Sequence, residues 1–489
     1  MRKQLKTVII AVVLFGLLLG AYFFAQYVNR ANEPEEAAEP EPTENLRLLE
    51  RPKEDLLSVT FSSDFEEMVF LPKIDERYNR VEWYIEGYED LSLETSTMDS
   101  MVTPVYYFSP IEKLDPTDDN LAEFGIDKPS VTVTGKYKDG SEEIVYIGKI
   151  APSGDYYYAK LDGTPGVYLL YSITGDRFFN TANDLVKKDI PGVYIDSLLY
   201  AYFYQKDTYE LEVGYTGSDD EMKKDLESYG MVSLSILKPY PGRDLYYSNL
   251  STNLLEHLES LSFKEVADTF PEDLSVYGLD DPEIIIHLID SEEDVYHMMI
   301  GADTEDGEYS YAMLADRPVV YTISKSMLEP FYDVNILKMV DKFVALVNIV
   351  NCDEIFIDSK DRGRSHHIAL NHEIVKAETE DDRDEEFIYP EIDGKFYEEQ
   401  PFKIYYQTLI GLMYDVEIFD YEIPGEPLFT VRYVMNDGKP DVWTRYYEYN
   451  NDFYAVKRDD NPVQFVVNKR SVVTMFDTLD KLFRGELKK

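Results

Sequence analysis

LAEFGIDKPSVTVTGKYKDGSEEIVYIGK, residues 121–149, opens a block that returns later in the chain as LSVYGLDDPEIIIHL, starting at residue 274. The two blocks align without a gap at a constant offset of 153 positions over residues 121–168. Fourteen of those 48 positions are identical. Self-similarity at a fixed offset over this length indicates an internal duplication, so the chain contains at least two copies of one structural unit.

The conserved positions of this repeat predict a helix end that turns into a strand. Gly125 follows a helical LAEF, where a left-handed cap residue favours glycine. A proline four residues later prevents the helix from continuing and favours an extended chain. We assign a structural role to the shared residues Leu121, Gly125, Asp127, Pro129, Gly148, Tyr158 and Ala159, and in the second copy Leu274, Gly278, Asp280, Pro282, Gly301, Tyr311 and Ala312.

The residues after each proline predict a four-stranded antiparallel meander. Residues 131–134 alternate between apolar and polar side chains, and Asp139-Gly140 is typical of a tight hairpin turn. Helices are expected before each meander, at 94–106, 251–263 and 402–414. A weaker third copy follows from residue 427, where PGEP at 424–427 replaces the Gly-x-Asp-x-Pro entry.

The pattern FGIDKPSVTVT…DG…IGK…YYAKLDG…VYLL resembles the bacterial domain of unknown function 4340, and YGLDDP…IGAD…YAML…VVY is similar to it. The resemblance covers most of the chain from about residue 52 and is weak after residue 346. It implies a membrane-attached protein associated with gliding-motility-type ABC transport systems, with transporter permease and ATPase subunits as possible partners. The family carries no established catalytic residues, so the resemblance implies a context and no reaction.

The N-terminus predicts a membrane anchor. Basic residues in 1–6 precede an uncharged run over 7–25, which at roughly 1.5 Å per residue nearly spans a hydrocarbon core of about 30 Å. Large residues continue after it, which favours an uncleaved anchor over the alternative of a cleaved signal peptide. The positive-inside rule then places the N-terminus in the cytoplasm and the body outside, in a single-pass protein of the cell membrane.

The rest of the chain divides into a linker and three expected domains. Residues 26–51 are rich in Glu and Pro and predict an extended acidic linker. Repeat domains are expected at 52–192 and 193–345, with a divergent third at 346–489. The predicted fold class is α+β, an N-terminal transmembrane helix followed by repeated domains of antiparallel β-meander plus helix.

The formal net charge of −48 argues against a nucleic-acid partner, because phosphate binding depends on Lys and Arg. The acidic residues are spread along the body and indicate a solubilising surface, with a cationic partner as the alternative.

Residues capable of chemistry do not form a recognisable motif. Cys352 is the single cysteine and is expected to be a buried thiol. His366 and His372 would lie roughly 20 Å apart on a strand and so could not share one metal ion. The acidic loop from Asp303 has Gly307 at the fifth position, where a calcium loop requires glycine at the sixth. We therefore predict no catalytic residue, no metal and no cofactor.

The remaining feature is a total of 41 tyrosines, several of them adjacent, as at 156–158, 246–247, 405–406 and 446–447. Tyrosine suits half-buried strands and also binding faces. The expected function is a non-catalytic accessory or scaffold component of an ABC-type transport system. The alternatives are a glycan- or peptide-binding module of the cell envelope, for which a shallow face lined by tyrosine would speak, and an unrecognised hydrolase.

Overall fold

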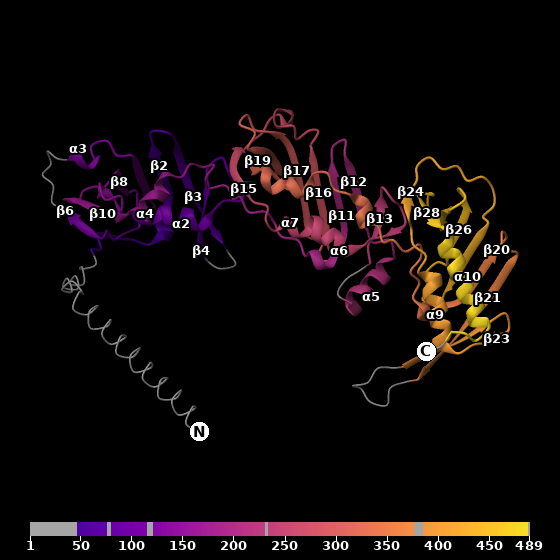
Figure 1. Ribbon diagram of the computed structural model, residues 1–489. Helices are drawn as coiled ribbons and strands as arrows, with labels where there is room; N and C mark the ends of the chain where they lie inside the picture. The colour runs from indigo at the N-terminus through magenta and orange to yellow at the C-terminus, as the bar shows by residue number, and fades with distance from the viewer. Residues whose placement is uncertain (1–45, 76–79, 115–120, 230–232, 376–384, 488–489) are drawn as a thin grey trace, which may run out of the picture. The chain divides into compact units, whose positions relative to one another are not determined.

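The computed structural model describes residues 46–487 apart from 76–79, 115–120, 230–232 and 376–384 (Figure 1). The predicted transmembrane helix at 7–25 and most of the predicted linker at 26–51 lie outside these residues. Within the part described, no helix is both long and apolar enough to cross a membrane. The prediction of a single-pass membrane protein with an extracytoplasmic body is therefore corrected, because no helix among the described residues supports it.

The predicted α+β fold class is also wrong, because antiparallel β-sheets dominate the described residues. Three large sheets of eight, nine and nine strands are present, with a fourth of two strands. The helices are short, the longest being α10 (Lys469–Phe483). The predicted helix at 94–106 illustrates the reason, since it is α-helical only over α2 (Thr95–Val102) and tightens into a 3₁₀ turn that contains Pro104.

The chain divides into two compact units, the first ending at Lys187 and the second covering Lys188–Lys489. The first unit contains one large sheet, with the strand order β4-β3-β2-β7-β8-β9-β10-β6. Its strands are β2 (Leu56–Ser63), β3 (Glu67–Asp75), β4 (Arg80–Ile85), β6 (Glu112–Leu114), β7 (Val131–Tyr137), β8 (Glu142–Ile150), β9 (Tyr156–Leu161) and β10 (Val167–Tyr171). The small sheet pairs β1 (Leu49–Glu50) with β5 (Tyr107–Phe108), and the short helices besides α2 are η1 (Lys53–Asp55), η2 (Thr103–Val105), α3 (Leu121–Phe124), α4 (Ser172–Gly175) and η4 (Asp176–Phe179).

The second unit begins with a nine-stranded sheet in the order β14-β13-β12-β11-β16-β17-β18-β19-β15. Its strands are β11 (Leu198–Gln205), β12 (Tyr209–Gly214), β13 (Ser235–Lys238), β14 (Arg243–Asp244), β15 (Phe263–Asp268), β16 (Ile284–Asp290), β17 (Val295–Asp303), β18 (Tyr309–Leu314) and β19 (Arg317–Ser324). The helical segments are η5 (Ile195–Ser197), α5 (Asp219–Tyr229), α6 (Tyr247–Leu250), the π-helical η6 (Ser251–Leu255), α7 (Glu256–Leu258), η7 (Leu274–Tyr277), α8 (Lys325–Leu328), η8 (Glu329–Phe331) and η9 (Ile336–Met339).

The other nine-stranded sheet of this unit has the order β23-β22-β21-β20-β25-β26-β27-β28-β24. Its strands are β20 (Cys352–Ser359), β21 (Arg364–Val375), β22 (Glu385–Ile392), β23 (Lys395–Phe396), β24 (Val416–Glu417), β25 (Phe429–Met435), β26 (Val442–Glu448), β27 (Phe453–Arg458) and β28 (Phe465–Asn468). Its helices are η10 (Ile349–Asn351), α9 (Glu399–Ile410) and α10.

The three large sheets share one topology. In each, the first strand lies at the centre, between its own hairpin partner and the first strand of the later meander (β3-β2-β7, β12-β11-β16, β21-β20-β25). The edge strand next to the end of the meander precedes that meander in sequence (β6, β15, β24). We call them the first, second and third sheets. The third keeps this order although its sequence has lost the Gly-x-Asp-x-Pro entry.

Charged side chains join the second and third sheets within the second unit. Arg243 is fully buried and its Nη2 donates to the Pro462 carbonyl oxygen (3.1 Å). Arg458 Nη1 donates to a carboxylate oxygen of Asp244 (2.6 Å), and Gln464 Nε2 donates to the Pro239 carbonyl oxygen (2.7 Å). Each contact crosses from one sheet's segment to the other, so these side chains form a polar junction between the two repeats.

Candidate functional site

The repeat-motif residues form the entry to each meander. Gly125 has φ 70° and Gly278 has φ 66°, the left-handed conformation that glycine adopts without strain. The N–H of Ile126 donates to the Leu121 carbonyl oxygen (3.0 Å), and the N–H of Leu279 donates to that of Leu274 (3.0 Å). These are the six-to-one bonds of a Schellman cap, so Leu121 and Leu274 serve to end a helical turn.

The remaining motif residues hold that turn against the meander. A Cβ at Gly148 would overlap the Phe124 carbonyl oxygen, and one at Gly301 would overlap that of Tyr277. The rings of Tyr158 and Tyr311 pack edge-on against these same residues, with centroids 4.8 Å and 5.0 Å apart. Gly148, Gly301, Ala159 and Ala312 are buried. Asp127 and Asp280 are exposed, and Pro129 and Pro282 lie half-buried before the strands.

Cys352 and the histidines of the third sheet form local contacts with neighbouring groups. Burial raises the pKa of the Cys352 thiol to about 12, so it is not a ready nucleophile at neutral pH. His366 pairs with Asp393 (2.7 Å), His367 with Glu354 (2.7 Å), and the His372 ring contacts the Cys352 carbonyl oxygen (2.9 Å). The described residues contain no group of three or more His, Cys, Asp or Glu that could hold a metal ion.

The loop that begins at Asp303 is a hairpin connection in the second sheet. Asp303 accepts a hydrogen bond from the Ser310 hydroxyl (2.8 Å) and forms an ion pair with Lys325. These two contacts hold the Asp303 carboxylate against neighbouring elements. The sequence contains a further acidic run, DDRDEE at 381–386, which begins outside the described residues.

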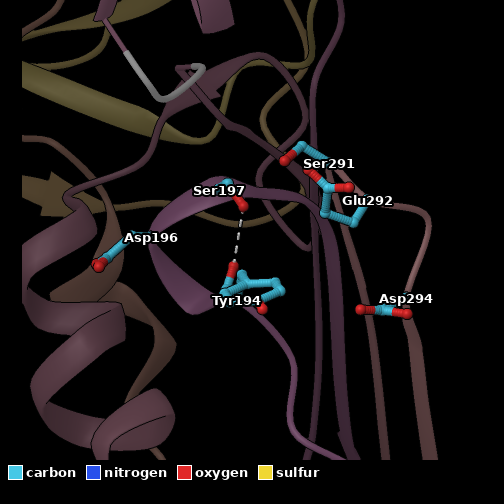
Figure 2. Close-up of a pocket in the computed structure, with 6 residues that line it drawn as sticks. All are labelled: Tyr194, Asp196, Ser197, Ser291, Glu292 and Asp294. Atoms are coloured by element: carbon cyan, nitrogen blue, oxygen red, sulfur yellow. Dashed lines mark hydrogen bonds between the residues drawn. The ribbon is translucent and has the colours of Figure 1, made fainter.

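An acidic hollow of about 530 Å³ lies beside the turn between β16 and β17 (Figure 2). Beneath it the fully buried Asp290 accepts hydrogen bonds from the backbone N–H groups of Tyr194 (2.8 Å), Glu292 (2.9 Å) and Asp294 (3.1 Å). Figure 2 shows Asp196 and Asp294 on opposite sides of the hollow, and both are exposed. The hollow is therefore an open surface around a structural aspartate, and its carboxylates do not converge. It is lined by Tyr194, Asp196, Ser197, Ser291, Glu292 and Asp294.

A more distinctive surface is the face of the second sheet that points away from its core. Along β11 the side chains of Ala201 and Phe203 are buried, which places Tyr200, Tyr202 and Tyr204 on the opposite face. Along β16 the buried residues alternate in the same way, so Ile285, His287 and Ile289 join that face. We call these six half-buried residues the tyrosine face: Tyr200, Tyr202, Tyr204, Ile285, His287 and Ile289.

The register between β11 and β16 places the six side chains in three cross-strand pairs. Tyr200 lies opposite Ile289, Tyr202 opposite His287, and Tyr204 opposite Ile285. Tyr202 and Tyr204 stack with parallel rings, and Tyr200 packs edge-on against His287. Aromatic and β-branched pairs on one face stabilise a sheet and also present a continuous apolar surface.

The face continues onto β17 and ends in carboxylates on β12. The ring of His297 stacks on that of His287, with centroids 4.7 Å apart, and burial lowers the pKa of both imidazoles. At the other side the Tyr200 hydroxyl donates to Glu212 (3.2 Å) and the Tyr202 hydroxyl to Glu210 (3.3 Å). Burial, followed by the charge of Glu210, raises the pKa of Tyr202 to about 12. Lys238 pairs with both glutamates, so two carboxylates share one cation.

The corresponding faces of the other sheets have a different chemistry. Register places Ser58, Thr60 and Ser62 of the first sheet opposite Lys136, Thr134 and Thr132. In the third sheet Glu354, Phe356 and Asp358 lie opposite Val434, Arg432 and Thr430. At equivalent positions of one topology, the first sheet therefore has a small polar face, the second an apolar aromatic face and the third a mixed charged face. These faces point away from the core of each sheet.

The sequence analysis did not predict the tyrosine face, because it considered tyrosines that are adjacent in sequence and not those at every second position. The signal that could have found it is LLYAYFYQ at 198–205, in which tyrosine recurs at every second position while Ala201 and Phe203 alternate with it. Such spacing is typical of a strand with two different apolar faces.

Comparison with known proteins identifies the repeat. Two regions of the chain, residues 83–201 and 250–364, match the family model described as Domain of unknown function (DUF4340). The internal repeat predicted from the sequence is thereby confirmed in two copies. No curated protein and no solved structure matches the chain.

Proposed function

Because the chain carries two copies of the DUF4340 domain, we propose that it is a non-catalytic accessory or scaffold component of an ABC-type transport system. The resemblance of the repeat to a family associated with such transporters supports the transport context. The scaffold role is supported by three sheets of one topology that present different faces.

The observation that carries this proposal is the tyrosine face. A contiguous apolar patch at the surface of a folded domain often marks an interaction site. The equivalent positions of the first sheet show that the same topology accepts Ser and Thr there, so the sheet itself does not require aromatic side chains. We therefore interpret the face as an interaction surface that one repeat has acquired.

Affinity purification tests the proposal directly. The tagged full-length protein is isolated from its native cells after mild chemical cross-linking, beside an unrelated acidic protein with the same tag. We expect enrichment of an ABC permease and its ATPase only with this protein. Recovery of neither subunit, or of both with the control, would overturn the proposal.

The tyrosine face also favours a second candidate, a glycan- or peptide-binding module. Tyrosine rings bind sugar and peptide groups because they combine an apolar body with a polar tip. Binding of cell-wall glycan by the purified protein, without transporter subunits in the affinity experiment, would favour this candidate over the first.

A further inference from the structure

We propose that the tyrosine face is the docking site for a partner protein segment that has an apolar side flanked by Lys or Arg, such as a basic amphipathic helix. This inference rests on the proposed function and names the surface and the partner chemistry that a scaffold of this kind would use.

The apolar part of the site follows from the register. The rows Tyr204–Ile285 and Tyr202–His287 extend to Met299 and His297 on the next strand. The three strands β11, β16 and β17 thereby place tyrosine, isoleucine and methionine side by side. Methionine adapts its shape to a partner, and tyrosine offers a large contact area at low entropic cost, which are properties common at binding surfaces.

The form of the occupant follows from how the sheet treats its other face. There Phe331 of η8 stacks on Phe203, and η8 contacts η6. The helical segment formed by α6, η6 and α7 contributes four buried leucines, Leu250, Leu254, Leu255 and Leu258. A sheet with a second apolar face is covered in the same way by a helix laid across it. A partner helix would therefore bury the tyrosine face as a third layer.

The charge of the occupant follows from the surroundings of the face. Glu210 and Glu212 line one edge, with Lys238 as their shared cation. Residues 193–345 contain 31 acidic and 10 basic residues, and the whole chain has a formal net charge of −48. A second copy of the chain would be repelled, whereas flanking Lys or Arg residues on a partner would be attracted and steered to the site.

The test uses a synthetic helical peptide of about 18 residues, or five turns, made of Leu and Lys with the leucines on one side. A scrambled peptide of the same composition keeps the charge and loses the apolar side. Binding of each peptide to the purified full-length protein is measured by fluorescence anisotropy. We expect the amphipathic peptide to bind at least about tenfold more tightly than the scrambled peptide.

Two matched variants locate the site. Tyr202→Ser replaces the central tyrosine of the face with a small hydroxyl side chain, similar to Thr60 at the equivalent position of the first sheet. Phe356→Ser is the control, because Phe356 occupies the equivalent position of the third sheet. We expect Tyr202→Ser to weaken binding of the amphipathic peptide by about tenfold or more and Phe356→Ser to leave it unchanged. Thermal unfolding of both variants shows that each is folded.

The inference would be overturned if the wild-type protein bound the two peptides equally, or if Tyr202→Ser bound the amphipathic peptide as tightly as the wild type. It would also be overturned if Phe356→Ser lost as much affinity for that peptide as Tyr202→Ser. Binding of a soluble wall oligosaccharide at the face in place of the peptide would also overturn it. The proposed function has its own test: it would be contradicted if affinity purification of the wild-type protein recovered no transporter subunits. If Tyr202→Ser still recovers those subunits, the docking inference fails and the scaffold function stands.

Discussion

At the scale of single residues, Gly301 shows how closely the repeat motif is packed. A Cβ at this position would overlap the Tyr277 carbonyl oxygen and approach the backbone of Gly278. Those atoms belong to the capped turn and cannot move as a flexible side chain could. Glycine at this position therefore allows the entry turn to lie directly on β17.

Gly301→Ala is expected to destabilise the second unit by roughly 1 to 3 kcal/mol, the usual cost of overpacking a tightly packed site. The measurement is the free energy of unfolding in urea. Gly192→Ala is the matched control in the same unit, because a Cβ there meets no atom within 4 Å. Equal stability of the two variants would contradict the close approach that we describe.

The histidine pair of the tyrosine face makes stability depend on pH. Burial lowers the pKa of His287 and His297 below the ordinary value of 6.5, so the unfolded chain binds protons more readily than the folded chain. Their contribution to stability is complete above about pH 6.5 and is lost as the pH falls toward the lowered folded values.

We expect the free energy of unfolding to fall between pH 7.5 and 6.0, and to fall less in His287→Gln, because this variant removes the imidazole whose pKa is lowered by burial and, in addition, by the charge of His297. Denaturant titrations at the two pH values measure this difference. His257→Gln, which changes a histidine on α7 outside the face, is the matched control. An unaltered pH dependence in His287→Gln would contradict the role assigned to the pair.

At the scale of elements, the sequence predicted the meander better than the helices. Alternating side chains at 131–134 and the Asp139-Gly140 turn correspond to β7, β8 and the hairpin between them, because strand period and turn chemistry are local properties. The helices were predicted with the wrong bounds: the helical run of α6, η6 and α7 covers 247–258 where 251–263 was predicted, and α9 covers Glu399–Ile410 where 402–414 was predicted. The ends of a helix that covers a sheet depend on that packing and are not a local property.

The candidate site could be predicted only in part. Alternation in LLYAYFYQ marks a strand, but which face is buried depends on the partner strand β16 and on the helices beneath it. The comparison of equivalent positions in the three sheets also requires register, since the first strands share only Leu-Leu and a later Phe in the first two repeats and neither feature in the third. The tyrosines at 200, 202 and 204 stand out as a possible binding surface only when they are compared with the equivalent residues of the first sheet, Ser58, Thr60 and Ser62.

The tyrosines of the second sheet also differ among themselves. The Tyr209 hydroxyl donates to the Phe331 carbonyl oxygen (2.8 Å) in the core. Tyr209→Phe is expected to cost about 1 to 2 kcal/mol, because a buried carbonyl loses its partner. Tyr204→Phe, on the tyrosine face, should cost little, since the structure gives its hydroxyl no such buried partner among the described residues. Chemical denaturation of both variants distinguishes them, and equal losses would contradict the assignment of faces.

At the scale of the molecule, the second and third sheets are joined by a junction of charges. Arg243 is buried there and Arg458 is half-buried. Nε and Nη1 of Arg243, Nε of Arg458 and the Tyr414 hydroxyl lack hydrogen-bond partners within the described structure. Buried polar groups without partners are expected to bind ordered water. The guanidinium of Arg243 also lies over the rings of Tyr414 and Phe465, which offsets part of the cost of its burial.

Arg458→Ala removes the ion pair with Asp244 across this junction. We expect the second unit to lose roughly 1 to 2 kcal/mol and its thermal unfolding to separate into two transitions, because the two sheets lose a shared ion pair whose Asp244 side chain is 42% exposed. Differential scanning calorimetry measures this. Arg484→Ala removes an exposed pair with Glu486 and should leave one transition. A single transition in Arg458→Ala would show that other contacts couple the two sheets.

The most direct test of the scaffold account is site-specific photocross-linking in native cells. A p-benzoyl-phenylalanine is placed at position 204 on the tyrosine face, and at the equivalent positions 62 of the first sheet and 358 of the third. The account predicts a covalent adduct with an ABC permease or ATPase subunit from position 204 and none from the other two. Adducts of equal yield from all three positions, or no transporter adduct from position 204, would contradict it.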